Sequence, residues 1–212
     1  MKTLIAVPSH DYMHADTCRC LMELDKPEDT GFALITNTLI FNARNMIAAE
    51  ALKAGFDRVM WIDADMVFPA DTLLRLAADM DTGKDFVTGL CFTRSEPSKP
   101  VIYKQLWWEL QDNRVKTGCE YYTDYPKDSV FEIQGSGFAC CMTSARLLAD
   151  MVEKRGQPFW PLMGMGEDTT FCFNARNAGY KIWCDSRIKV GHIGEKVFDE
   201  LEYWRAAYEM PV

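Results

Sequence analysis

Hydrophobic residues in the first half of the chain alternate between short uninterrupted runs and helically spaced stripes. An uninterrupted run predicts a β-strand that is covered on both faces. A stripe such as Ala43, Ile47 and Ala51 predicts the buried face of a helix, and Gly55 is a typical end for it. The runs predict strands at Thr3–Val7, Arg58–Ile62 and Asp85–Phe92. The stripes predict helices at Asn42–Lys53 and, after Pro69, at Asp71–Met80. Strands that alternate with helices indicate an α/β domain with a mostly parallel sheet.

The second half of the chain mixes several patterns. Val101–Leu106 alternates between apolar and polar positions, as an antiparallel strand does. Trp107–Asp128 is polar, aromatic and without a period, so we expect a loop or flap there, while Asp11–Thr30 gives no clear prediction. Further strands are expected at Phe138–Met142 and Lys181–Cys184, and helices at Ser144–Lys154, Glu167–Ala178 and Phe198–Tyr208. Together these elements predict a three-layer α/β fold, a single domain over residues 1–212 in which helices flank a mixed, mostly parallel central sheet.

Composition excludes several classes of function. The 212 residues suffice for one domain with a hydrophobic core. The net charge of -8 argues against a nucleic-acid partner, because phosphate binding needs a basic surface. The apolar run near the N-terminus, Leu4–Val7, is too short for a signal peptide or a membrane span, so we expect no membrane insertion and a cytoplasmic location. The eight cysteines contain no Cys-x-x-Cys pair and are expected to be reduced thiols.

The sequence VMWIDADMVF, residues 59–68, ends an apolar strand with two acids. Asp63 and Asp65 lie at the carboxyl end of this strand, where open α/β sheets bind ligands, and residues i and i+2 point the same way. Two carboxylates about 4 Å apart repel each other by on the order of 4 kcal/mol at an effective dielectric constant of 20. A divalent cation would offset this repulsion, and oxygen ligands suit Mg²⁺ or Mn²⁺. The alternative is that one acid forms an Asx-turn and the other caps a helix.

Further polar groups follow in the last third of the chain. Glu167 and Asp168 open a predicted helix, where acids also serve as ordinary N-terminal caps. The segment Gly-His-Ile-Gly-Glu-Lys, residues 191–196, combines the imidazole of His192, a flexible backbone at Gly194 and the cation Lys196. This combination suits a metal-bound diphosphate, although a single histidine is commonly structural. Neither a P-loop nor a dinucleotide oxidoreductase is expected, because the chain has no GxxxxGK[ST] motif and no GxGxxG after its first strand.

These features, in this order, resemble nucleotide-sugar glycosyltransferases of the GT-A fold. The resemblance covers nearly the whole chain and rests on Asp63 and Asp65 after an apolar strand, the glycine-rich step at 135–137, Glu167-Asp168 before the sequence NAGYKIW, and His192. It implies transfer of a sugar from a nucleotide-diphosphate donor, with a UDP-sugar favoured, to a glycan or glycoprotein, and Mn²⁺ or Mg²⁺ as cofactor. The chain is also similar to the small glycosyltransferases of large algal viruses, such as chlorella viruses, which glycosylate capsid proteins; the location would then be the host cytoplasm.

The resemblance also implies roles for individual residues. Residues 1–93 would form a nucleotide-binding half and residues 94–212 an acceptor and catalytic half. The donor nucleotide and its diphosphate would contact Pro8, Ser9, His10, Arg44, Asp63, Ala64, Gly194 and Lys196. The donor sugar and the acceptor would pass close to Gly135, Ser136 and Gly137. The metal ligands would be Asp63, Asp65 and His192, and the catalytic residues Asp168, Glu167 and Lys196.

The stereochemical outcome follows less directly from the sequence. The segment at 191–196 is similar to that of retaining members, although its lysine comes one residue early, so we expect retention of configuration. In a retaining enzyme Asp168 would position the sugar or the acceptor, and in an inverting enzyme it would be the general base for the acceptor hydroxyl.

Two other classes of protein also fit parts of the sequence. VMWIDADMV matches the hhhhDxDx[TV] motif of haloacid-dehalogenase-like Mg²⁺-dependent phosphatases, with Asp63 as the nucleophile and Asp65 as the acid/base. That family carries the motif on its first strand, whereas a strand and a helix precede it here. A non-catalytic sugar-binding module would stack sugars on aromatic side chains but would leave the acids without a role. The aromatic side chains concerned are Trp107, Trp108, Tyr121 and Tyr122.

Overall fold

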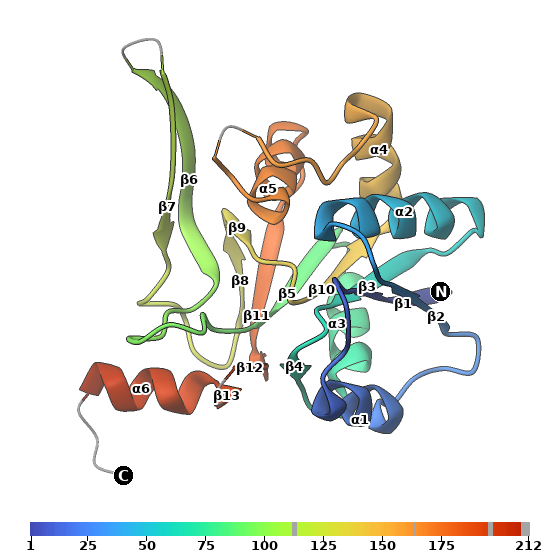
Figure 1. The fold of residues 1–212 in the computed structure, drawn as a ribbon, viewed down its shortest axis with the longest axis horizontal. Helices are drawn as coiled ribbons and strands as arrows, with labels where there is room; N and C mark the ends of the chain where they lie inside the picture. Colours follow the sequence, from blue (N-terminus) through green and yellow to red (C-terminus); the bar gives the residue numbers. More distant parts are fainter. Residues whose placement is uncertain (112–113, 163, 195–196, 209–212) are drawn as a thin grey trace.

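Figure 1 shows the chain as a computed structural model, which describes residues 1–111, 114–162, 164–194 and 197–208. A seven-stranded central sheet has the order β2-β1-β3-β10-β5-β11-β8. β1 pairs in parallel with β2 and β3, β5 pairs in parallel with β11, and β10 and β8 run antiparallel to their neighbours. These strands are β1 (Thr3–Pro8), β2 (Gly31–Ile35), β3 (Arg58–Ile62), β5 (Phe86–Leu90), β8 (Val130–Ile133), β10 (Cys140–Ser144) and β11 (Ile182–Lys189). The mixed, mostly parallel sheet expected from the sequence is confirmed.

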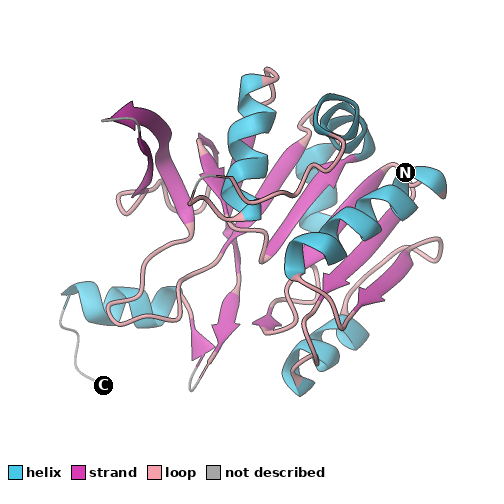
Figure 2. Cartoon of the chain, turned by 45° about the horizontal axis from the view of Figure 1, so that its top comes forward, coloured by secondary structure: helices cyan, strands magenta, loops and turns pink. Residues whose placement is uncertain are grey.

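Helices cover both faces of this sheet and give the fold three layers (Figure 2). Successive strand residues belong to two hydrophobic cores: Leu4 and Ala6 lie in one, Ile5 and Val7 in the other. The first core includes residues of α2 (Ile40–Lys53), α4 (Ala145–Arg155) and α5 (Glu167–Asn177). The second includes residues of α1 (Ala15–Glu23) and α3 (Thr72–Met80). Because neither face of the sheet meets water, β1 and β3 are apolar at nearly every position, which explains the uninterrupted runs.

Two three-stranded sheets and a last helix complete the described chain. One sheet has the order β13-β12-β4 and the other the order β7-β6-β9. Their strands are β4 (Met66–Val67), β12 (Gly191–Ile193) and β13 (Val197–Phe198), then β6 (Ile102–Gln111), β7 (Arg114–Tyr121) and β9 (Gly135–Ser136). The last helix, α6 (Glu200–Tyr208), contacts the first core through Tyr203, whose ring lies 5.3 Å from that of Phe92.

The expectation of a loop over Trp107–Asp128 was wrong, because most of this segment forms the β6–β7 hairpin. The described side chains of this hairpin from Trp107 onward are exposed or half-buried on both of its faces, so no buried stripe marks the strand period along the sequence. The edge strands β2 and β8 and the helix α1 were also not predicted. Residues of β2 alternate between half-buried and exposed, which gives a weaker apolar signal than the buried inner strands do.

Strands from both proposed halves of the chain share the central sheet. β10 lies between β3 and β5, and β11 lies next to β5. The division at residue 93 therefore does not separate two hydrophobic cores, and a division of function between the halves stays a prediction. None of the helices in the described part of the chain has the length and the hydropathy that a membrane span requires.

Candidate functional site

Segments far apart in the sequence meet at one edge of the central sheet. β1, β3, β5 and β11 run in the same direction, so their carboxyl ends lie together. Asp63–Asp65 directly follows β3, Arg94 follows β5, and β12 follows β11. A pocket of about 660 Å³ lies between these segments and the residues after β1. Its lining includes the predicted site residues Pro8, Ser9, His10, Asp63, Ala64, Asp65, His192 and Gly194.

Two contacts orient the ring of His192 toward Asp65: one through the backbone of β12 and one through the ring nitrogen Nδ1. β12 pairs with β4, and the amide of Ile193 donates a hydrogen bond of 2.8 Å to the backbone carbonyl of Asp65. The Nδ1 atom of His192 lies 3.0 Å from the carbonyl oxygen of Phe92. A carbonyl can only accept, so Nδ1 carries the hydrogen in this contact. The Nε2 atom is left facing Oδ2 of Asp65 at 3.4 Å, so that an imidazole nitrogen and a carboxylate oxygen point at the same small space.

The residues at this position fit a divalent ion that is shared with a bound ligand. A carboxylate oxygen and an imidazole nitrogen are both ligand types that Mn²⁺ accepts. No group of three potential ligand side chains occurs in the described part of the chain. Mg²⁺ and ions like it are commonly held by one or two protein groups together with phosphate oxygens. Asp65 and His192 supply such a partial set, and the open pocket leaves room for the rest.

Arginines already balance the charge of the two acids. Nη1 of Arg94 donates to Oδ2 of Asp65 at 2.8 Å, and Nη2 of Arg44 donates to Oδ1 of Asp63 at 2.7 Å. The sequence-based argument that the acids need a metal ion to be tolerated is therefore corrected. Burial opposes ionisation of Asp65, but His192 and Arg94 outweigh it and lower the pKa of Asp65. Burial raises the pKa of Asp63, and Arg44 opposes this effect.

Arg94 was missed in the sequence, although its position carries a signal. It is a cation shortly after the carboxyl end of a parallel strand, at the edge where ligands bind. Its side chain is half-exposed and lines the pocket, so the guanidinium can contact an anion there while it holds Asp65.

Arg44 is a buried link between the pocket and the amino end of α5. Its side chain is only 2% exposed, because its position on α2 faces the core. While Nη2 holds Asp63, Nε donates to Oε1 of Glu167 at 3.3 Å. The guanidinium also lies 5.3 Å from the centre of the Phe138 ring. Arg44 is not part of the pocket lining and holds two acids from behind, and its direct contact with the nucleotide stays a prediction.

Asp168 lies beside the predicted glycine-rich step. A Cβ atom at Gly137 would lie 3.6 Å from Oδ2 of Asp168, and one at Gly166 would lie only 2.8 Å from its Oδ1. The amide of Thr169 donates to Oδ1 at 2.6 Å. Burial, and then the negative charge of Glu167, raises the pKa of Asp168 to about 6. This acid is therefore prepared to change protonation near the pH at which enzymes work.

The predicted residues thus form two groups joined by Arg44. The first surrounds the pocket, and the second contains Glu167, Asp168 and the step at 135–137, where β9 is fixed by pairing with β6. Lys196, predicted to act on the diphosphate, lies outside the described residues.

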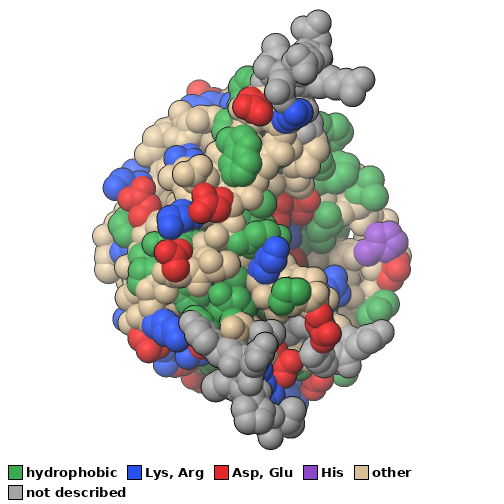
Figure 3. All heavy atoms as spheres, turned by 90° about the vertical axis from the view of Figure 1, so that its left-hand side faces the viewer, with side chains coloured by type: hydrophobic (Ala, Val, Ile, Leu, Met, Phe, Trp, Pro, Cys, Tyr) green, Lys and Arg blue, Asp and Glu red, His purple; other side chains and the backbone are tan. Residues whose placement is uncertain are grey.

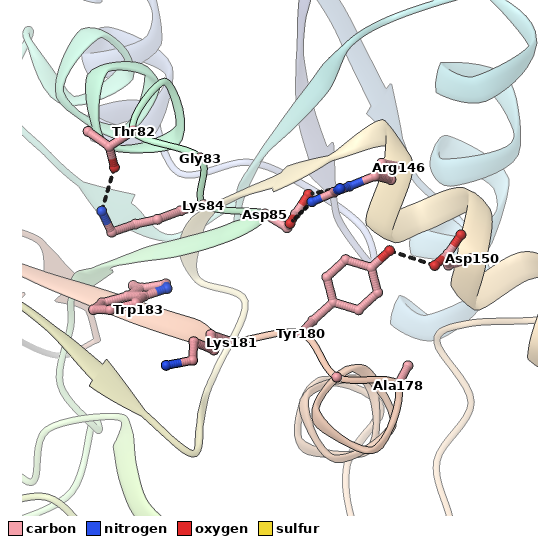
Figure 4. Close-up of a pocket in the computed structure, with 11 residues that line it drawn as sticks. Thr82, Gly83, Lys84, Asp85, Arg146, Asp150, Ala178, Tyr180, Lys181 and Trp183 are labelled. Atoms are coloured by element: carbon pink, nitrogen blue, oxygen red, sulfur yellow. Dashed lines mark hydrogen bonds and ion pairs between the residues drawn. The ribbon is translucent and has the colours of Figure 1, made fainter.

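A second pocket of similar volume, about 610 Å³, lies at the opposite edge of the sheet, near the start of β5 and β11 (Figure 4). Several of its charged and polar side chains are already paired with one another. Arg146 bonds Asp85, and the hydroxyl of Tyr180 donates to Asp150 at 2.6 Å. It contains none of the predicted site residues, so volume alone does not identify the functional site.

No protein-family model matches the chain, and no curated protein matches it. Among solved structures, A197 from STIV aligns with a TM-score of 0.66 at 17% sequence identity, over 92% of this chain and 86% of that chain. GalNAc-T7, solved with UDP, GalNAc and Mn²⁺, aligns with a TM-score of 0.54 at 12% identity, over 98% of this chain but only 47% of that chain. Likeness at these identities concerns the fold. The chain has the GT-A fold that its sequence resemblance implied.

Proposed function

We propose that this chain is a metal-dependent glycosyltransferase that moves a sugar from a UDP-sugar to a glycan or glycoprotein. One observation carries the proposal: Oδ2 of Asp65 and Nε2 of His192 face each other at 3.4 Å inside a pocket at the carboxyl ends of parallel strands. The crystal structure of GalNAc-T7 with UDP, GalNAc and Mn²⁺, which has a similar fold, supports this class of donor and metal.

In this proposal the pocket holds the nucleotide end of the donor. Pro8, Ser9 and His10 lie beside the base, and Asp63 contacts the ribose. Asp65 and His192 hold Mn²⁺ or Mg²⁺. Such an ion would screen the negative charge that develops on the leaving diphosphate. Arg94 lies next to Asp65 and adds a second positive charge for the same anion, as Lys196 would.

The second group of residues acts on the sugar and the acceptor. The acceptor hydroxyl donates a hydrogen bond to the carboxylate of Asp168, which orients it toward the anomeric carbon of the donor sugar. Glu167 is held by Arg44 and keeps the amino end of α5 fixed relative to Asp63. We expect retention of configuration, which is tested by recording the anomer of the first product by NMR.

The nucleotide and metal assignment is tested by thermal unfolding. UDP at about 100 times its dissociation constant should add about 2.7 kcal/mol of stability, or about 5–10 °C in Tm for a chain of this size, and only with Mn²⁺ or Mg²⁺. GDP, CMP and inorganic phosphate serve as controls at the same concentration. A Tm that is unchanged by UDP with Mn²⁺ contradicts the proposal. Hydrolysis of p-nitrophenyl phosphate with Mg²⁺, blocked by beryllium fluoride, would favour the phosphatase class instead.

The raised pKa of Asp168 predicts a pH dependence of both rate and stability. Since the carboxylate is the form that accepts a hydrogen bond, the transfer rate should rise with pH through about 6 and level off above it. The free energy of unfolding should change in the opposite direction. Folding raises the pKa of Asp168, so the folded state loses stability as the pH rises above about 4, the pKa of an aspartate in the unfolded chain.

Asp168→Asn separates these two effects. It should be more stable than the wild type at pH 7, by on the order of 1–3 kcal/mol, and should lose the rate step near pH 6 together with most of its activity. A variant that keeps both the activity and the pH step would show that another group accepts this hydrogen bond. The matched control is Asp124→Asn, an exposed acid whose replacement should leave the pH profile unchanged.

A further inference from the structure

The β6–β7 hairpin is a long two-stranded arm that stands beside α5 (Figure 1). Its base is tied to the proposed catalytic group, because β9 pairs with β6 at Ile102 and Tyr103. Figure 3 views the molecule from the side of this arm, where acidic, basic and hydrophobic side chains are interspersed and acidic side chains lie in a recess.

The register of the hairpin sorts its side chains onto two faces. Tyr103 pairs with Tyr121, Leu106 with Cys119, and Trp108 with Thr117. Alternate residues of β7, namely Tyr121, Cys119 and Thr117, point to the same face, and paired residues share a face. Because β6 has one extra residue between Tyr103 and Gln105, the three partners on β6 also lie on that face. The opposite face carries the pairs Gln105–Glu120, Trp107–Gly118 and Glu109–Lys116. The adjacent tryptophans therefore point in opposite directions.

The face with Trp108 is the one turned toward the proposed catalytic group. Leu106 is buried, and its Cδ1 lies 2.5 Å from where a Cβ of Gly135 would be. A Cβ atom at Gly135 would also lie 3.1 Å from Cβ of Cys172. Cys172 is on α5, the helix that begins at Glu167 and Asp168. Further along the arm, Oγ1 of Thr117 lies 3.4 Å from the Cβ position of Gly164. Burial, and then the charge of Asp168, raises the pKa of Cys119, so that carboxylate is near this face.

Trp107 and Trp108 differ in what their rings do. On the outer face the ring of Trp107 lies across the strand pair, where a Cβ at Gly118 would be 2.4 Å from its Cζ2. This ring therefore covers its own hairpin with one side, while the side chain is 42% exposed. Trp108 is 52% exposed on the inner face, two residues beyond the buried Leu106, which is a step of about 6.6 Å along a strand.

The chemistry of the inner face suits a neutral sugar. The hairpin side chains on it are aromatic, aliphatic, hydroxyl and thiol groups without formal charge, and the one neighbouring cation described is Lys99, 5.1 Å from the Tyr121 ring. The outer face carries Glu109, Lys116 and Glu120. An exposed indole ring stacks on the apolar C–H face of a sugar, and neighbouring hydroxyl groups can hydrogen-bond its edge. The base of the face also packs at Gly135 against α5, the helix whose first turn carries Asp168, whose proposed partner is a sugar hydroxyl.

We propose that this inner face of the hairpin binds the acceptor saccharide, with Trp108 as the stacking platform that directs an acceptor hydroxyl toward Asp168. The inference rests on the proposed glycosyl transfer and names the part of the acceptor that the chain recognises. Trp107, although adjacent, has no part in this contact.

The test compares Trp108→Ala with Trp107→Ala and Trp108→Phe. The probes are methyl glycosides of the common neutral hexoses and N-acetylhexosamines, titrated by saturation-transfer NMR. Each titration is done with and without UDP and Mn²⁺. Trp108→Ala should weaken binding of the best glycoside about tenfold, whereas Trp107→Ala should bind like the wild type. Trp108→Phe keeps an aromatic face and should retain most of the affinity. Circular dichroism and Tm verify that each variant folds.

Several results would overturn this inference. One is equal weakening in the two alanine variants, and another is the absence of binding by every glycoside to the wild type. A third is a wild-type dimer that Trp108→Ala dissociates in sedimentation analysis, since the face would then bind a second copy. The Tm shift with UDP and Mn²⁺ is recorded for every variant. If the wild type lacks that Tm shift, the proposal of UDP-sugar binding is wrong. If the Tm shift is normal but Trp108→Ala binds glycosides like the wild type, only the proposal of acceptor binding is wrong.

Discussion

Asp65→Ala should abolish the metal-dependent binding of UDP and reduce sugar transfer by at least about 100-fold. The reason is that Asp65 is one of only two protein ligands in the proposed metal site. Even mutation of a residue that merely hydrogen-bonds a metal ligand lowers metal affinity or activity by about 10–100-fold. The loss also leaves Arg94 and His192 without their shared partner. The measurements are the Tm shift with UDP and Mn²⁺ and the rate of UDP release in the presence of an acceptor.

The control for this variant is Asp124→Ala, because that acid is exposed and pairs only loosely with Lys104 at 3.5 Å. His192→Ala should reproduce the loss of metal dependence, since the ring supplies the other ligand. A normal Tm shift with UDP and Mn²⁺ in Asp65→Ala would mean that the ion is held elsewhere, and the reading of this pocket as a metal-diphosphate site would have to be abandoned.

Arg44→Met should lower the free energy of unfolding by about 3 kcal/mol or more. Removing one member of a buried ion pair leaves charge in a poorly solvated place, which commonly costs about 3–5 kcal/mol. Here a single guanidinium serves two acids, with Nη2 on Asp63 and Nε on Glu167. Arg44→Lys should not restore the stability, because a single ammonium lacks the planar fork that reaches both carboxylates. Urea unfolding measures the change.

The matched control is Arg146→Met, which removes an exposed arginine paired with Asp85 and should cost less than about 1 kcal/mol. Neutralising the stranded acids, in Arg44→Met with Asp63→Asn and Glu167→Gln, should recover part of the lost stability. Equal destabilisation by Arg44→Met and Arg146→Met would show that the buried bridge is not a special source of stability.

The elements that were predicted correctly are those whose signal is local. β3 is apolar at Val59 through Ile62 because it is buried on both faces, and α4 begins where Ser144 accepts a hydrogen bond from the amide of Leu147, as its capping role predicts. The elements that were missed depend on distant partners. β2 and β8 are edge strands, and the β6–β7 hairpin is recognisable only from the pairing of its two strands.

In the candidate site, too, some residues could be placed from the sequence and others could not. The acids at 63 and 65 were expected at this edge because they follow a strand, and strands of one direction end at one edge of a sheet. The imidazole at 192 was expected there only from the resemblance to nucleotide-sugar glycosyltransferases. The long side chains could not be placed like this. Arg44 and Arg94 each reach several ångströms from their backbone, and the carboxylates they bond are set by helix packing and loop paths that are not encoded at neighbouring positions.

The sequence by itself determined which apolar stretches form the inner strands and helix faces, where the acids stand relative to those strands, and hence the α/β class with a polar edge. Only the tertiary structure decided that one buried arginine connects the two groups of acids, and which face of the hairpin each tryptophan takes. The physical reason is that burial and strand direction follow from local hydrophobic pattern, whereas ion pairs and strand register depend on groups that folding brings together from distant parts of the chain.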